Sequence, residues 1–219
     1  MISKYTTEFL AQLSENNNKE WFEKNRSSYE LAKIDFKKLL EQLIINVSKF
    51  DSSIKHLEAK NCIFRINRDV RFSKNKAPYK NNFGAIISPG GKKALTAGYY
   101  IQIEPKGSFL AGGMWQPPSP QINAIRQEID YNTKEFKKII TNKEFKKYFG
   151  ELSDEDKLKS VPKGYEKTHP EIELLKHKSF IIVHHLTDKD IIAKDFVEKA
   201  TNVFEAMYPF NAFLRRACD

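Results

Sequence analysis

Apolar residues in the first quarter of the chain recur at i, i+3, i+4 and i+7, with lysines and glutamates on the intervening positions. An asparagine run at residues 16–18 separates a first short helix from the longer pattern that follows. The spacing predicts an amphipathic helix that reaches about Val47, either unbroken or divided by a kink between Arg26 and Tyr29.

The middle of the chain changes to the two-residue alternation of strands, interrupted by short turns that contain proline and glycine. Turns of this length join antiparallel neighbours. A continuous apolar run later in the chain predicts one further, buried strand. The predicted strands are residues 62–72, 83–88, 98–104, 108–114 and 179–185.

Helical spacing returns on both sides of that last strand. Ser119 and Pro120 begin a central group of short helices that ends at Gly150, and residues 151–178 form a charged loop. A C-terminal helix follows, which is expected to be interrupted at Pro209. Together these elements predict an α+β fold with an antiparallel sheet of about five strands, flanked by N-terminal, central and C-terminal helices.

The length of the chain fits one domain. Its 219 residues, 40% of them hydrophobic, are enough to bury roughly 70% of the unfolded surface in one core. No low-complexity linker divides the sequence. We therefore expect a single domain over residues 1–219.

The number of cysteines and the distribution of apolar residues indicate the cellular compartment in which the protein works. Cys62 and Cys218 fit no disulfide framework and no metal-ligand spacing, which favours a reducing environment. The N-terminal residues lack the apolar run of a signal peptide, and no stretch approaches the roughly 20 apolar residues of a membrane helix. These features predict a cytoplasmic protein without membrane contact.

The formal net charge of +9 favours a nucleic-acid partner, because clustered cations gain affinity by releasing phosphate counterions. Lysine is frequent throughout the chain, however, so solvated lysine-rich faces are a competing explanation. Charge alone leaves both interpretations open.

The densest cluster of like charge lies between Arg65 and Tyr79, where three arginines and two lysines accompany one carboxylate, Asp69. The residue types favour a strand with a bulge or an end near Arg68 to Asp69, and a bulge there would aim Arg68 and Arg71 to the same side. Guanidinium groups suit a carboxylate or phosphate ligand because each presents a planar fork of donors and stays charged. Asp69 would orient one of the arginines, or else act as a base or metal ligand.

Two further residues extend the candidate site. Tyr99 and Tyr100 alternate across a strand, so at most one of them can face the arginines, and Lys163 lies on a loop. The candidate ligand-binding residues are Arg65, Arg68, Asp69, Arg71, Lys76, Tyr79, Tyr100 and Lys163.

The spacing Arg65-x-x-Arg68-Asp69-x-Arg71-Phe72-x-x-Asn75-Lys76-x-x-Tyr79 resembles the signature of a bacterial family known as domain of unknown function twenty-four sixty-one. Further similarity lies at residues 17–22, 98–105, 112–117 and 162–165, so the resemblance spans nearly the whole chain. It implies a family but no mechanism, since that family has no established activity or catalytic residues.

Three functions remain open at this stage. The arginines could form a pocket for a phosphate, nucleotide or carboxylate, or belong to a nucleic-acid-binding module. They could also be structural, paired with internal carboxylates such as Glu20, Asp69 and Glu104. The usual hydrolase, zinc-protease and nucleotide-binding motifs are absent, and no metal site is expected because His184 and His185 face opposite sides of their strand. The sequence identifies no cofactor, reaction or oligomeric state.

Overall fold

The computed structural model describes residues 1–154 and 156–218. At its centre is a four-stranded antiparallel sheet in the order β1-β2-β3-β4. The strands are β1 (Phe83–Ile87), β2 (Gly98–Ile103), β3 (Phe109–Met114) and β4 (Phe180–His185). The predicted α+β class and antiparallel sheet are confirmed, but the sheet has four strands where we expected about five.

The strand predicted at residues 62–72 is the one that does not form. Its first residue ends a helix, and an isolated bridge between Ile63 and Ala85 is what ties the following segment to β1. Phe72, which the alternation placed on an apolar face, is 96% exposed. No other part of the chain that the structure describes covers Phe72. The apolar–polar alternation of this segment therefore did not lead to a strand.

The rest of this segment folds back on itself. The Arg68 amide donates to the Pro78 carbonyl at 2.9 Å, and the Lys80 amide donates to the Ile66 carbonyl at 2.8 Å. Pairing its own two ends satisfies these backbone groups without the sheet. We call residues 65–80 the basic loop.

Helices make up much of the remaining chain. They are α1 (Lys4–Glu15), α2 (Lys19–Lys24), α3 (Arg26–Val47), α4 (Ala59–Cys62), α5 (Ser119–Tyr131), α6 (Thr133–Ile140), α7 (Lys143–Phe149), α8 (Ile172–Leu175), α9 (Asp188–Ile192) and α10 (Phe196–Arg216). The 3-10 turns are η1 (Ser52–Ile54) and η2 (Gly91–Lys93). Within residues 1–154 and 156–218, no helix combines the length and the apolar character needed to cross a bilayer.

The structure tests two predictions about the helices, the kink near Arg26 and the interruption at Pro209. Asn25 divides the N-terminal pattern into α2 and α3, at the start of the region where a kink was expected. The interruption predicted at Pro209 is wrong, because α10 continues through it. Proline removes one helical hydrogen bond, but Met207 and Phe210 on either side are fully buried and hold the helix against the core.

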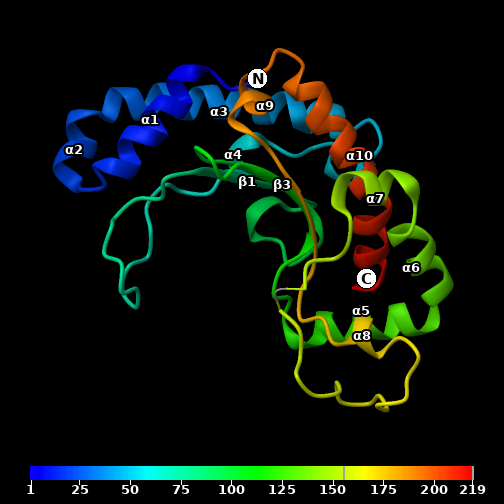
Figure 1. Cartoon of the computed structure of the whole chain (residues 1–219). Helices are drawn as coiled ribbons and strands as arrows, with labels where there is room; N and C mark the ends of the chain where they lie inside the picture. Colours follow the sequence, from blue (N-terminus) through cyan, green and yellow to red (C-terminus); the bar gives the residue numbers. More distant parts are fainter. Residues whose placement is uncertain (155, 219) are drawn as a thin grey trace.

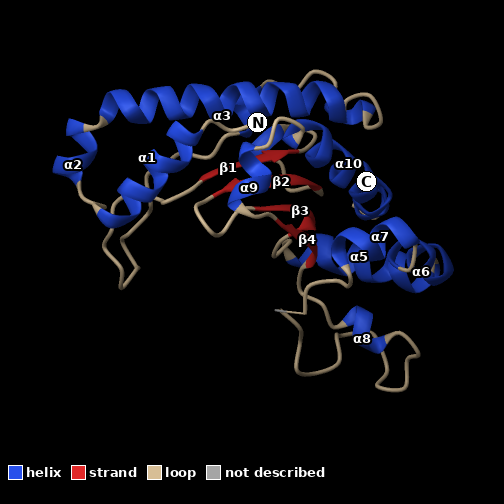
Figure 2. Cartoon of the chain, turned by 45° about the horizontal axis from the view of Figure 1, so that its top comes forward, coloured by secondary structure: helices blue, strands red, loops and turns tan. Residues whose placement is uncertain are grey.

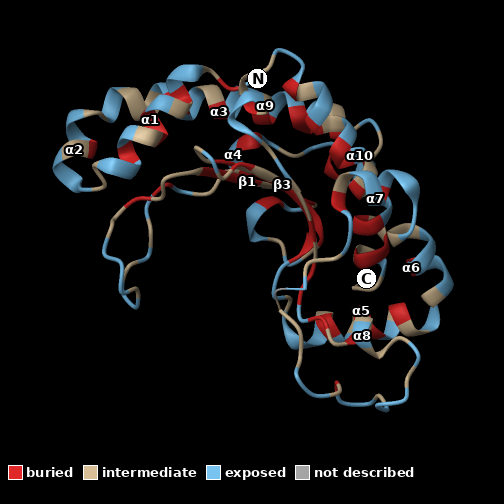
Figure 3. Cartoon of the chain, in the orientation of Figure 1, coloured by how far each residue is buried: buried red, intermediate tan, exposed pale blue. Residues whose placement is uncertain are grey.

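Helices cover one face of the sheet, as Figures 1 and 2 show. α3 and α10 contact this face, and Tyr99 and Ile101 of β2 are fully buried beneath them. Figure 3 shows the buried positions concentrated between these helices and the strands. Tyr100 and Gln102 alternate to the opposite face and are only half-buried. We call that side of the sheet the open face, since Figures 1 and 2 show no helix stacked on it.

Candidate anion-binding site

The basic loop is attached to the N-terminal helices through Asn17. Its Nδ2 donates to the Tyr79 carbonyl at 2.9 Å, and its Oδ1 accepts from the Tyr79 amide at 3.0 Å, as a neighbouring strand would. The Tyr79 ring stacks on Phe22 with the ring centroids 3.9 Å apart. The asparagine run between α1 and α2 therefore positions the end of the basic loop.

Replacing Asn17 with alanine is expected to loosen this loop. Two backbone groups of Tyr79 lose their partner, so the free energy of unfolding should fall by about 1–3 kcal/mol. Amide hydrogen exchange measured by mass spectrometry should accelerate over residues 65–80. Asn16→Ala is the control, because the Asn16 side chain bonds only within its own helix end. Equal protection of the loop in both variants would contradict the anchoring role of Asn17.

Arg68 is directed into the basic loop. Its Nη1 donates to the Ala77 carbonyl at 3.0 Å and its Nη2 to the Ser73 hydroxyl at 3.3 Å. These contacts hold the guanidinium group in place while leaving part of its donor capacity unused.

Arg71 and Asp69 pair with each other. Arg71 Nε lies 3.0 Å from Asp69 Oδ1, and Nη2 lies 2.6 Å from Oδ2. Both side chains are exposed. The hydrogen bonds from Arg71 hold the pKa of Asp69 below its ordinary value, which makes this carboxylate a poor base. The two contacts fit the predicted role in which Asp69 orients one of the arginines, here Arg71.

The other basic candidates of the loop lie apart. Lys76 Nζ donates to the Val70 carbonyl at 3.0 Å. Arg65 is exposed and makes no hydrogen bond or ion pair with the residues that the structure describes. The three arginines therefore do not share one hollow, and the bulge that would have aimed Arg68 and Arg71 together is absent.

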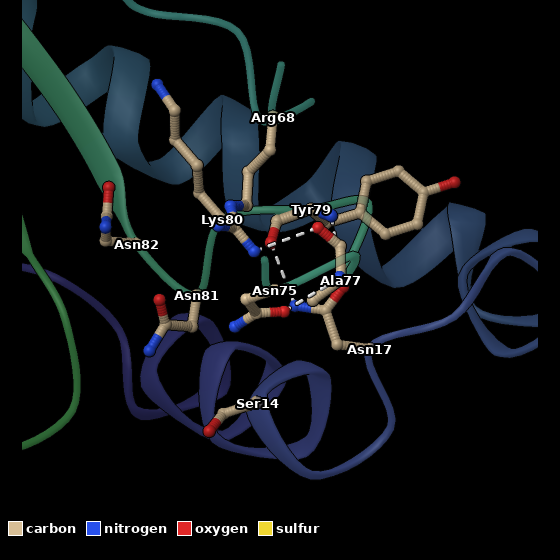
Figure 4. Close-up of a pocket in the computed structure, with 9 residues that line it drawn as sticks. All are labelled: Ser14, Asn17, Arg68, Asn75, Ala77, Tyr79, Lys80, Asn81 and Asn82. Carbon is tan, nitrogen blue, oxygen red and sulfur yellow. Dashed lines mark hydrogen bonds between the residues drawn. The ribbon is translucent and has the colours of Figure 1, made fainter. Parts of the chain in front are cut away.

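A pocket of about 410 Å³ lies between the end of α1 and the basic loop (Figure 4). We call it the loop pocket. Its lining residues are Ser14, Asn17, Arg68, Asn75, Ala77, Tyr79, Lys80, Asn81 and Asn82. Of the residues expected from the sequence, Arg68 and Tyr79 line it. Its charged lining residues are Arg68 and Lys80, and no carboxylate belongs to the lining.

Lys80 carries an uncompensated charge. Its Nζ lies 5.5 Å from the centroid of the Phe64 ring, and no described carboxylate forms an ion pair with it. Burial lowers the pKa of Lys80, and the nearby positive charge of Arg65 lowers it further. A bound anion would relieve that repulsion, so the charged lysine and the anion would stabilise each other.

Tyr100 and Lys163 lie outside the loop pocket. Tyr100 is on the open face, where its hydroxyl donates to Gln102 Oε1 at 2.9 Å. Burial, with a smaller contribution from Glu104, raises the pKa of Tyr100 to about 12, so the phenol stays protonated at neutral pH. Lys163 is exposed in the segment between α7 and α8, which Figure 1 shows away from the basic loop.

Sequence reasoning missed much of the pocket lining. Lys80, Asn81 and Asn82 follow directly after the basic segment, and Asn75 lies within it. Three asparagines and a lysine just before β1 were a usable signal, because amide and ammonium groups are hydrogen-bond donors. Ser14 had no signal, since it lies on a helix surface that only the folded chain brings to the loop.

No group of three or more histidine, cysteine, aspartate or glutamate side chains in residues 1–154 and 156–218 has an arrangement suited to a metal ion.

A family model described as conserved hypothetical protein (DUF2461) matches residues 5–213 of the chain. This match covers most of the sequence and confirms the family that the basic segment suggested. No curated protein and no solved structure gives a match.

Proposed function

Since the chain belongs to the DUF2461 family, whose description names no reaction, we propose from the geometry of the site that it binds an anion in the loop pocket. The ligand class is a phosphate, the phosphate group of a nucleotide, or a carboxylate. Arg68 and Lys80 supply the charge, and the asparagine amides supply neutral donors.

The observation that carries this proposal is the charge of the pocket lining. Two cations line the loop pocket with no carboxylate among the lining residues. Asn81 Nδ2 donates a hydrogen bond to Glu104 Oε1 at 2.8 Å. Glu104 follows directly after β2 and is not one of the lining residues of the pocket. Donors with spare capacity in a concave site are features of an anion-binding site. Figure 4 shows Arg68 directed toward the asparagines of the pocket, whereas the Lys80 side chain extends away from them.

An anion is expected to stabilise the folded protein. At a concentration tenfold above Kd, binding adds about 1.4 kcal/mol to the free energy of unfolding, which raises Tm by about 3–6 °C for a domain of this size. Thermal unfolding with inorganic phosphate, citrate and AMP measures this shift. Lys80→Met should weaken binding about tenfold or more, since it removes a charge-assisted contact while keeping the aliphatic stem.

Two variants sharpen that experiment. Lys163→Met removes the same charge from an exposed loop outside the pocket and should leave the shift unchanged. Asn82→Asp places a carboxylate in the pocket at nearly constant volume and should abolish the shift. The proposal fails if no anion raises Tm, or if Lys80→Met and Lys163→Met respond alike.

The structural interpretation of the arginines applies to part of the loop. The Arg71 guanidinium is occupied by Asp69, and two donors of Arg68 serve the loop backbone and Ser73. These contacts fit a loop that is held ready for a ligand. Of the two cations that line the pocket, Lys80 is the one that makes no side-chain hydrogen bond or ion pair with the residues that the structure describes.

A further inference from the structure

Four aromatic side chains form a row across the open face of the sheet. Phe64 lies beside β1, Tyr100 on β2, Phe109 on β3 and His185 on β4. Successive ring centroids along this row are 6.3, 5.6 and 6.5 Å apart. We call these four residues the aromatic row.

The strand register places these rings on one face. Phe109 pairs with Gln102 on one side and with His185 on the other, and Gln102 alternates with buried Ile101. Residues directly opposite each other in a sheet point to the same side. Phe64, Tyr100 and Phe109 are half-buried and His185 is exposed, so each residue of the row keeps some solvent-accessible surface.

Gly84 lets the Tyr100 ring lie over β1. A Cβ at Gly84 would come within 2.6 Å of the Tyr100 hydroxyl, so a larger residue would displace the ring. The hydrogen bond to Gln102 fixes the ring in this position. A ring that is already fixed loses little conformational entropy when a ligand stacks on it.

The aromatic row is continuous with the loop pocket. Lys80 lines the pocket, and its Nζ lies over the Phe64 ring. At the same end, Glu104 accepts from Asn81 of the pocket and from Gln102 of the open face, at 2.8 and 2.6 Å. A ligand that spans both regions would therefore meet the cations of the pocket, then the Glu104 carboxylate at the junction, and the rings beyond it.

The basic loop gives this end of the sheet a positive charge. Residues 65–80 contain six lysines and arginines and one carboxylate, Asp69. Figures 1 and 2 both show the loop extending from the sheet on the side of the open face. The positive field of such a loop attracts a polyanion.

We propose that the open face binds single-stranded nucleic acid, with bases stacked on the aromatic row and a phosphate in the loop pocket. The inference rests on the proposed function for the position of that phosphate. Rings beside a cationic groove are how proteins hold single strands without reading sequence, because every base has a face that stacks. A duplex keeps its bases stacked on one another and offers no face to the row.

The test is fluorescence anisotropy with labelled 12-nucleotide oligo-dT and oligo-rU, compared with a duplex of equal length and with the mononucleotides. Either single strand should bind at least tenfold more tightly than its mononucleotide and than the duplex. Tyr100→Leu and Phe109→Leu keep apolar volume but lose the ring, and each should weaken binding about fivefold or more. Tyr131→Leu is the matched control, since Tyr131 is a 74% exposed ring on α5 outside the row.

The outcomes separate the two proposals. If phosphate raises Tm through Lys80 but oligonucleotides bind no better than mononucleotides, the open-face inference is overturned and the anion pocket stands. If oligonucleotides bind and the row variants weaken that binding while Lys80→Met leaves it unchanged, the row stands and the placement of a phosphate in the loop pocket is overturned. The Tm shift with phosphate then decides the pocket proposal by itself. Equal binding by Tyr100→Leu, Phe109→Leu and Tyr131→Leu, with unchanged Tm for all three, overturns the inference whatever the affinity.

Discussion

Replacing Gly113 with alanine should lower the free energy of unfolding by about 4 kcal/mol or more. Gly113 lies in β3 with a φ of +111°, a conformation that residues with a Cβ rarely adopt. An added Cβ would come 1.9 Å from the Phe180 carbonyl oxygen of β4, so the backbone of the sheet would have to move. A loss of this size is a large part of the roughly 5–15 kcal/mol that stabilises a domain.

Gly164→Ala separates the clash from the backbone strain. Gly164 also has a positive φ, of +93°, but an added Cβ would meet no atom within 4 Å. Its substitution should cost only about 1 kcal/mol. Urea unfolding followed by circular dichroism measures both variants. If both variants lose a similar amount of unfolding free energy, a Cβ at Gly113 does not clash with β4, which contradicts the predicted effect.

The second large effect is expected at Asp51, a residue of the N-terminal half that forms an ion pair with Arg215 of α10. Its carboxylate accepts from Arg215 at 2.6 and 3.1 Å, and from the Tyr99 hydroxyl at 2.8 Å. The Asp51 side chain is 2% exposed and the Arg215 side chain 12%. Asp51→Asn leaves the Arg215 charge buried without its partner, which should cost about 3–5 kcal/mol in the free energy of unfolding.

The chain offers a matched control for that variant. Asp69 and Arg71 form the same two-point contact, but on the exposed surface. Solvent screening makes such pairs weak, so Asp69→Asn should change stability by no more than the error of urea unfolding. Equal effects at Asp51 and Asp69 would contradict a role for burial.

The same carboxylate predicts how stability depends on pH. Burial alone raises the pKa of Asp51, but the hydrogen bonds from Arg215 and Ser53 outweigh it, so the pKa lies below its ordinary value. Stabilisation by this group is therefore complete above the unfolded pKa of about 4 and is lost as pH falls through the lower folded pKa. Between about pH 5 and 3, the wild type should lose more stability than Asp51→Asn. A parallel decline in urea titrations would rule this out.

Local periodicity determined much of the fold from the sequence. The amphipathic helices, the strands at residues 83–114 and the opposite facing of Tyr99 and Tyr100 follow from spacing within single elements. The basic segment and the further similarity along the chain also indicated the family, which the match over residues 5–213 confirms. Spacing misled at residues 62–72, where the alternation was real but the chain paired with itself.

The candidate site could not be predicted in the same way, because the density of charge along a chain does not determine which partner each charged side chain contacts. Only the folded loop decided that Arg71 would pair with Asp69, while Lys80 would line a pocket beside Asn17. The aromatic row did not follow from the sequence either. Tyr100 and Phe109 lie on consecutive strands, but Phe64 and His185 come from segments far from them in the chain. Strand register and loop closure are long-range contacts, so tertiary structure alone brought these side chains together.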